Sequence, residues 1–136
     1  MSTILRVGGE NFDVDVSLQQ STLAPCKVFR RGKPKCVGSK QLSNKSGFNL
    51  EVSEADFNDF EKQIKNAVEF LKSNEEAISK LTEWIGVESM SLDFGVSRDE
   101  SFAFQSITFP NQLLKLAGNL GVDIEATLYP ISEGET

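Results

Sequence analysis

The feature that most constrains the fold is a change of hydrophobic period near the middle of the chain. Residues 47–52 (GFNLEV) place Phe48, Leu50 and Val52 at alternate positions, which is typical of a strand with one buried face. From residue 57 to residue 85, apolar residues recur three or four positions apart, which is the spacing of a helix lying on a core. Because the strand and the helix must bury their apolar faces against each other, this change of period predicts an α+β domain.

Local signals suggest where this helical region begins, breaks and ends. Ser53, with an acidic residue at Asp56, matches a capping box, so we expect the helix to begin directly after the strand. A second cap-like sequence at residues 73–76 predicts a break in the helix. Gly86 is a suitable residue to end it.

The other predicted elements complete one domain of 136 residues. We predict further strands at residues 2–7, 26–30, 89–96, 102–107 and 122–129, and shorter helices at 13–20 and 110–120. The strands at 89–96 and 102–107 would form a hairpin with its turn at 97–100. The order over about 47–129 is then βαββαβ, a ferredoxin-like core, preceded by an N-terminal βα(β) unit. This order predicts an antiparallel or mixed sheet with helices packed on one face.

The composition is that of an ordinary globular chain, with 39% apolar and 25% charged residues. The first residues do not resemble a secretory signal, and no window approaches the roughly 18–20 apolar residues of a membrane helix. We therefore expect a cytoplasmic protein. In that compartment Cys26 and Cys36 are expected to be free thiols.

The charge is distributed unevenly along the chain. Although the net charge is −6, seven of the 14 basic residues lie between residues 27 and 45, with no acidic residue among them. Most of these belong to a polar loop predicted at about 31–46, and a short acidic tail is predicted at 131–136. An acidic surface elsewhere disfavours nucleic acid as the main partner and favours a partner that carries basic groups.

The residue inventory offers little catalytic chemistry. The chain contains no histidine, which excludes Ser-His-Asp and Cys-His catalysis and most zinc sites, and we expect no metal or cofactor. Asp13 and Asp15 could suggest a cation loop, but their spacing fits a turn and helix cap better. Cys26 lies beside basic residues that could activate a thiolate nucleophile, although a small buried residue in a strand is the simpler interpretation.

The basic loop contains the candidate binding residues. Arg30, Arg31, Lys33 and Lys35 concentrate positive charge in a turn that could bind phosphate, nucleic acid or an acidic protein. The simpler interpretation is a solvated loop whose cations pair with the acidic side chains of the predicted long helix, among residues 54–69.

Several short motifs resemble a known family. They are VGGENFDVD at residues 7–15, then Leu18, Leu23 and Pro25, then FRRGKP at 29–34, a late tryptophan after a long helix, and LLKLAGNLGVDIE at 113–125. Together they resemble the uncharacterised bacterial proteins of domain-of-unknown-function family 4279. The chain departs from the pattern of the family directly before the Arg-Arg-Gly turn. Val28-Phe29 stands there in place of the aromatic residue of many members. The resemblance implies a small cytosolic α+β domain of no established activity.

Two functions remain open from the sequence. The first is a non-enzymatic protein-interaction domain, in its specific form an immunity-type protein that neutralises a basic toxin or nuclease. The alternative is a small-ligand or nucleic-acid binder that uses the basic residues between positions 27 and 45. Homodimerisation through a sheet edge or an uncovered face is compatible with either function.

Overall fold

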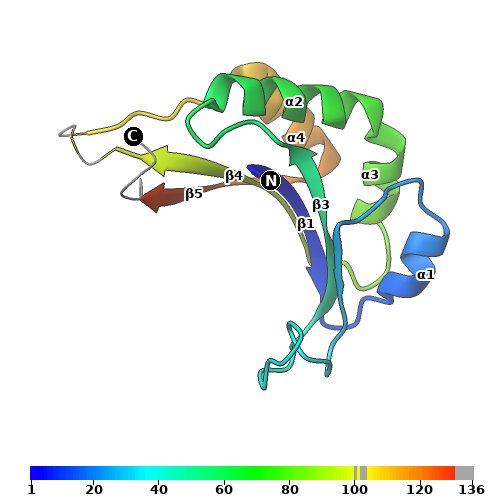
Figure 1. Cartoon of the computed structure of the whole chain (residues 1–136). Coiled ribbons are helices and arrows are strands. Elements are labelled where there is room, and N and C mark those ends of the chain that lie inside the picture. The colour runs from blue at the N-terminus through cyan, green and yellow to red at the C-terminus, as the bar shows by residue number, and fades with distance from the viewer. Residues whose placement is uncertain (100, 102–103, 131–136) are drawn as a thin grey trace.

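The computed structural model describes residues 1–99, 101 and 104–130, and shows four helices and a five-stranded mixed sheet in that part of the chain (Figure 1). The predicted α+β class, the mixed sheet and the N-terminal βα(β) unit are confirmed. The elements are β1 (Thr3–Gly9), α1 (Val14–Gln19), β2 (Lys27–Phe29), β3 (Ser46–Ser53), α2 (Phe60–Ser73), α3 (Glu75–Thr82), β4 (Ser89–Arg98), α4 (Asn111–Leu120) and β5 (Asp123–Pro130).

The order of strands across the sheet is β2-β3-β1-β4-β5. From β3 onward the chain runs strand, two helices, strand, helix, strand, so it lacks one strand of the predicted βαββαβ core in the described residues. The predicted strand at 102–107 is wrong for residues 104–107, which form no strand, while residues 102–103 lie outside the described part. β1 takes the place beside β4, pairing antiparallel with both β3 and β4. β1 thus pairs with β4 where the predicted hairpin partner would have paired. On the other side of β4, β5 pairs with it in parallel after the crossover through α4.

The start of α2 also differs from the prediction. The helix begins at Phe60, where the Asp59 side chain accepts a hydrogen bond from the Lys62 N–H. Ser53 ends β3, and its hydroxyl oxygen accepts from the Ala55 N–H and lies 2.7 Å from the Asn66 side-chain oxygen. Ser53 therefore does not cap α2. It is still part of the sheet, and the residues between Ser53 and Phe60 form the turn that leads into the helix.

The predicted end of the helical region at Gly86 is wrong, because α3 ends at Thr82, with Glu83 as its C-cap. Three other helix boundaries agree with the sequence signals. α2 and α3 are separated at Asn74, whose side-chain amide donates to the Phe70 carbonyl. Gly121 ends α4 with a φ of 75°, a left-handed conformation that glycine adopts without strain. Asp13 caps α1 by accepting from the Val16 N–H.

The core lies between the sheet and the helices. Alternate residues of the three central strands point into it, and they meet the apolar faces of α2, α3 and α4. The largest of these buried apolar side chains are Phe48, Phe94, Leu5, Leu71, Ile78, Leu92 and Leu113. Phe60, Phe94 and Phe109 pack edge-on or tilted, with centroids 5.3–5.9 Å apart.

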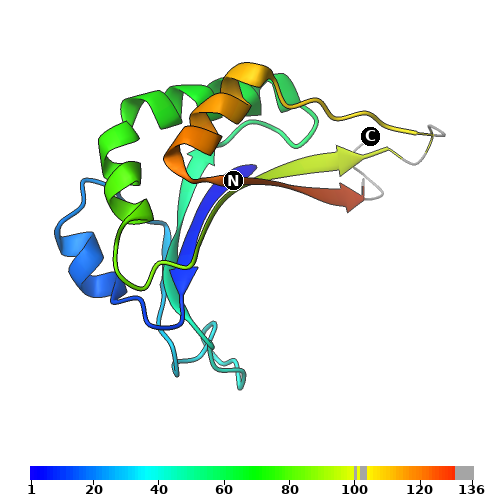
Figure 2. The same ribbon diagram turned by 180° about the vertical axis from the view of Figure 1, so that it is seen from behind.

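The sheet is strongly bent, and the helices lie against its convex side (Figures 1 and 2). Both views show the concave side with none of the four described helices over it. The strand positions that alternate with the core therefore form a solvent-facing surface, as is common in sheets built mainly from antiparallel strands.

Candidate functional site

The structure places the four predicted binding residues together, at the base and in the first turn of a loop that projects beyond β2 and β3. The loop is held by backbone hydrogen bonds, including one from the Ser43 N–H to the Lys33 carbonyl and one from the Gly32 N–H to the Ser43 carbonyl, and by an isolated bridge between Pro34 and Leu42. The interpretation that the loop cations pair with the long helix is not supported by any ion pair between them in the described residues.

Arg30 pairs with α1 instead. Its Nη2 lies 2.6 Å from Asp15 Oδ1 and its Nε lies 3.0 Å from Asp15 Oδ2, which is a two-point contact. The hydrogen bond from Arg30 lowers the pKa of Asp15 from its ordinary value, and the same contact raises the pKa of Arg30. Arg31 makes a long contact of 3.5 Å to Asn11. The loop is therefore anchored to α1, and one of its four candidate cations is already neutralised.

The two cysteines are free and exposed. The simpler interpretation of Cys26, as a buried residue within a strand, is wrong, because Cys26 lies just before β2 at the surface. Its thiol donates to the Asn49 carbonyl at 3.3 Å, and its Sγ lies 3.6 Å from the Met1 sulfur.

The concave side of the sheet carries a polar surface to which all five strands contribute. We call it the open sheet face, and define it by two neighbouring rows of residues that cross the strands. The register places Glu51, Ile4, Asp93 and Glu125 in one row, and Lys27, Asn49, Arg6, Ser91 and Asp123 in the next. These rows bring four carboxylates and two cations onto one surface.

An ion pair fixes the middle of the open sheet face. Arg6 Nη2 donates to Asp93 Oδ2 at 3.1 Å, and the Thr127 hydroxyl donates to Asp93 Oδ1 at 2.7 Å. These bonds join β1, β4 and β5 through side chains and leave Asp93 satisfied. The acidic groups of β5, Asp123 and Glu125, form no ion pair within the described residues, so they are available to a partner.

An exposed aromatic pair lies at the far end of β5 from Asp123, with Tyr129 about 13 Å along the strand from Glu125. The Phe57 ring lies over Gly95, where an added Cβ would come within 2.5 Å of the ring. The Phe57 and Tyr129 ring centroids are 5.1 Å apart, and both side chains are about 40% exposed, at 39% and 43%. Exposed aromatic side chains are typical of protein-binding surfaces.

A second pair of carboxylates lies at the opposite flank of the same face. A side-chain hydrogen bond with Glu54 raises the pKa of Glu51, with smaller contributions from burial and from repulsion between the two groups, while the N-terminal amino group of Met1 acts in the opposite direction. This flank would therefore gain from the approach of a cation. The open sheet face thus has unpaired negative charge on both sides of the Arg6–Asp93 pair.

Sequence reasoning missed the open sheet face. Its residues are widely separated in the chain, and only the position of β1 between β3 and β4 brings them together. One signal was present: Val122–Pro130 alternates acidic or polar residues with apolar residues, so a charged outer face of this strand could have been predicted from the sequence.

The described residues offer neither a metal-binding cluster nor a membrane-spanning helix. They contain no group of three or more histidine, cysteine, aspartate or glutamate side chains that could hold a metal ion. None of the helices in residues 1–99 or 104–130 has both the length and the apolar character needed to cross a membrane.

Comparison with known proteins gives a family match. A family model described as a domain of unknown function (DUF4279) matches residues 1–130. No curated protein and no solved structure matches the chain.

Proposed function

The chain belongs to the family of domains of unknown function DUF4279, and we propose that it is a non-enzymatic protein-interaction domain whose open sheet face binds a basic partner. The observation that carries the proposal is the excess of carboxylates on this face, where none of the described helices covers the sheet. In its specific form, the partner is a basic toxin or nuclease that the protein neutralises in the cytoplasm.

Charge complementarity supports a basic partner. Asp123 and Glu125 lie on an edge strand, where a partner's lysine or arginine side chains can reach them without moving the protein's own cations. Opposite charges across an interface accelerate association and exclude partners of the wrong sign.

The aromatic pair supports a protein as the partner. Phe57 and Tyr129 provide an exposed apolar surface at the end of β5, on the same strand as the carboxylates Asp123 and Glu125. A partner surface can place an apolar side chain on this pair and a lysine or arginine on Glu125, two face positions along β5, which combines apolar contact with a charge-assisted hydrogen bond.

The proposal is tested by purifying the tagged protein from its native host and identifying the proteins that co-purify with it, before and after reversal of the charge on the open sheet face. A tagged chain carrying Asp123→Lys and Glu125→Lys is compared with the wild type, and with a control carrying Glu61→Lys and Glu69→Lys on the exposed side of α2. Both variants change the net charge equally, so a nonspecific effect of charge would act on both.

We expect a basic protein, identified by mass spectrometry, to be recovered with the wild type and the α2 control and lost from the β5 variant. Assay of that protein for nuclease or other toxic activity, with and without this domain, then tests the specific form. Equal recovery with all three chains, or no partner in stoichiometric amount, would contradict the proposal.

The basic loop supplies the alternative function. Arg31, Lys33 and Lys35 form no ion pair in the described part of the chain, so they are available to an anionic ligand. Nucleic acid that absorbs at 260 nm, remains bound through the wash and is lost from an Arg31→Glu, Lys33→Glu variant would favour this alternative over the open sheet face.

A further inference from the structure

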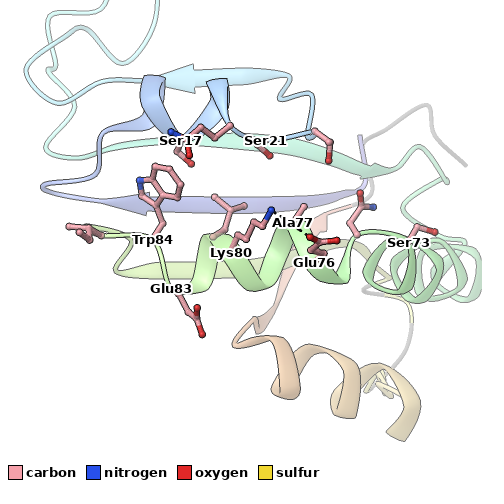
Figure 3. Close-up of a pocket in the computed structure, with 13 residues that line it drawn as sticks. Ser17, Ser21, Ser73, Glu76, Ala77, Lys80, Glu83 and Trp84 are labelled. Atoms are coloured by element: carbon pink, nitrogen blue, oxygen red, sulfur yellow. Dashed lines mark ion pairs between the residues drawn. The ribbon is translucent and has the colours of Figure 1, made fainter.

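A pocket lies on the helical side of the sheet, away from the open sheet face. One wall is the end of α1 with the residues that follow it, and the other wall is α3 (Figure 3). Its volume of about 700 Å³ is within the range of pockets that hold small molecules. We propose that this pocket binds a small uncharged sugar.

A buried hydroxyl group in the wall is the first argument. Ser17 of α1 is 2% exposed, and its Oγ has no hydrogen-bond partner within the described residues. Ser17 lines the pocket, and Figure 3 shows it on the wall that faces α3. A buried hydroxyl without a partner is unfavourable. The Oγ is enclosed, so a ligand hydroxyl bonds to it when the Ser17 side chain turns toward the pocket, and that bond would remove the cost.

The other polar groups of the pocket are mainly uncharged. Hydroxyl and amide side chains come from the α1 wall and from the break between α2 and α3: Gln20, Ser21, Thr22, Ser73 and Asn74. Each hydroxyl can donate and accept hydrogen bonds, and each amide carries both a donor and an acceptor group. This matches the hydroxyl groups of a sugar, which also donate and accept.

The charges in the pocket do not favour an anionic ligand. Lys80 lies 3.5 Å from Glu76 and is paired with it, as the dashed line in Figure 3 shows. Glu83 is a further lining carboxylate. A phosphate or carboxylate ligand would therefore meet one paired cation and two carboxylates, which excludes phosphorylated sugars from the proposal.

Trp84 supplies the apolar surface that a sugar ring needs. Its indole lies between α3 and the Ser17 wall (Figure 3), and Ala77 and Leu81 are further apolar residues of the lining. A pyranose ring has one face of C–H groups that can lie on an aromatic ring, while its hydroxyls point outward to polar groups. Trp84 is the single tryptophan of the chain, so its fluorescence reports on this pocket alone.

The test is a fluorescence titration of the full chain with glucose, galactose and N-acetylglucosamine, and with adenosine and uridine for comparison. We expect saturable change with at least one sugar and none with the nucleosides. Ser17→Ala should weaken sugar binding about tenfold, or about 1.4 kcal/mol. Ser79→Ala, which removes an exposed hydroxyl from α3 outside the pocket, should bind as the wild type does.

A stability measurement separates lost binding from lost folding. Because Ser17→Ala removes an unpaired buried hydroxyl, the unliganded variant should be at least as stable as the wild type in urea. The Asp123→Lys, Glu125→Lys variant should retain sugar binding, so failure of the protein-interaction proposal would leave this one standing. No response to any of the sugars, a response to nucleosides alone, or unchanged sugar binding in Ser17→Ala would overturn the proposal.

Discussion

Arg6 of β1 and Asp93 of β4 form an ion pair at the centre of the open sheet face, with Arg6 Nη2 3.1 Å from Asp93 Oδ2. The Asp93 side chain is 9% exposed, whereas the arginine is 40% exposed. The carboxylate is thus fixed and satisfied by its own protein. The proposed binding of a basic partner is therefore assigned to the carboxylates at the flanks of this face, Glu51, Asp123 and Glu125.

Replacing Arg6 should destabilise the fold. Arg6→Met keeps the aliphatic stem but leaves the largely buried Asp93 with Thr127 as its remaining side-chain donor among the described residues. We expect a loss of about 1–2 kcal/mol in the free energy of unfolding, since charged hydrogen bonds are worth more than neutral ones but this arginine is partly hydrated. Urea denaturation measures it. Lys65→Met on the exposed side of α2 is the control, and equal effects in the two variants would contradict the assigned role of the pair.

A methyl group at Gly95 should displace the Phe57 ring. The Cβ of Gly95→Ala would lie 2.5 Å from the ring, so we expect a loss of about 1–3 kcal/mol of stability from overpacking. Gly118→Ala is the matched control, because its Cβ would meet nothing within 4 Å on an exposed helical position. That change should stabilise the protein by about 0.5–1 kcal/mol. Thermal unfolding should show a lower unfolding temperature for Gly95→Ala and a higher one for Gly118→Ala. A neutral or stabilising Gly95→Ala would show that the ring does not lie where the structure places it.

Gln63 of α2 should be essential for joining the helix to the sheet. Its fully buried amide accepts from the Thr3 hydroxyl at 2.9 Å and donates to the Gly95 carbonyl at 2.8 Å. Gln63→Leu leaves both groups unpaired, so we expect a loss of about 2–4 kcal/mol of stability in urea denaturation. Gln112→Leu, an exposed position on α4, should change stability by less than about 0.5 kcal/mol. A loss no greater than in this control would refute the role of the buried amide.

The carboxylate pair of Glu51 and Glu54 predicts a pH dependence. The pKa of Glu51 is raised above its ordinary value of 4.5, so its contribution to stability is full at low pH and falls as the pH rises through the raised pKa. Glu51→Gln removes this titration. We therefore expect the variant to unfold at a higher temperature than the wild type at neutral pH, with the difference vanishing below about pH 4. A scan of unfolding temperature against pH tests this, with Glu69→Gln on α2 as the control. A difference that persists unchanged at low pH would show that titration of Glu51 is not its cause.

Much of the fold could be predicted because its elements have clear periods and clear ends. The strand at β3, the helix after Pro110 and its end at Gly121 follow from local chemistry. The failures have a common physical cause. Residues 104–107 belong to a segment of strand-like composition, but β1 and β5 already occupy the two pairing edges of β4, and that competition acts through tertiary structure.

The candidate sites were less predictable than the fold. Ser53 and Asp59 are both suitable caps by residue type, and only the length of β3 decides between them.

The basic loop was found from the sequence because its charges are close together in the chain. The open sheet face was not, because placing Asp93 beside Arg6 depends on a register that no local pattern specifies.

The central claim is that the open sheet face binds a basic protein, and photo-cross-linking in the native host tests it most directly. A photoreactive p-benzoylphenylalanine replaces Tyr129 at the edge of the open sheet face in one chain, and replaces Leu114, exposed on α4, in another. We predict a cross-linked adduct with a basic protein from position 129, its loss when Asp123→Lys and Glu125→Lys are added, and no such adduct from position 114. Adducts of equal yield from both positions, or an adduct from position 129 that survives the charge reversal, would contradict the claim.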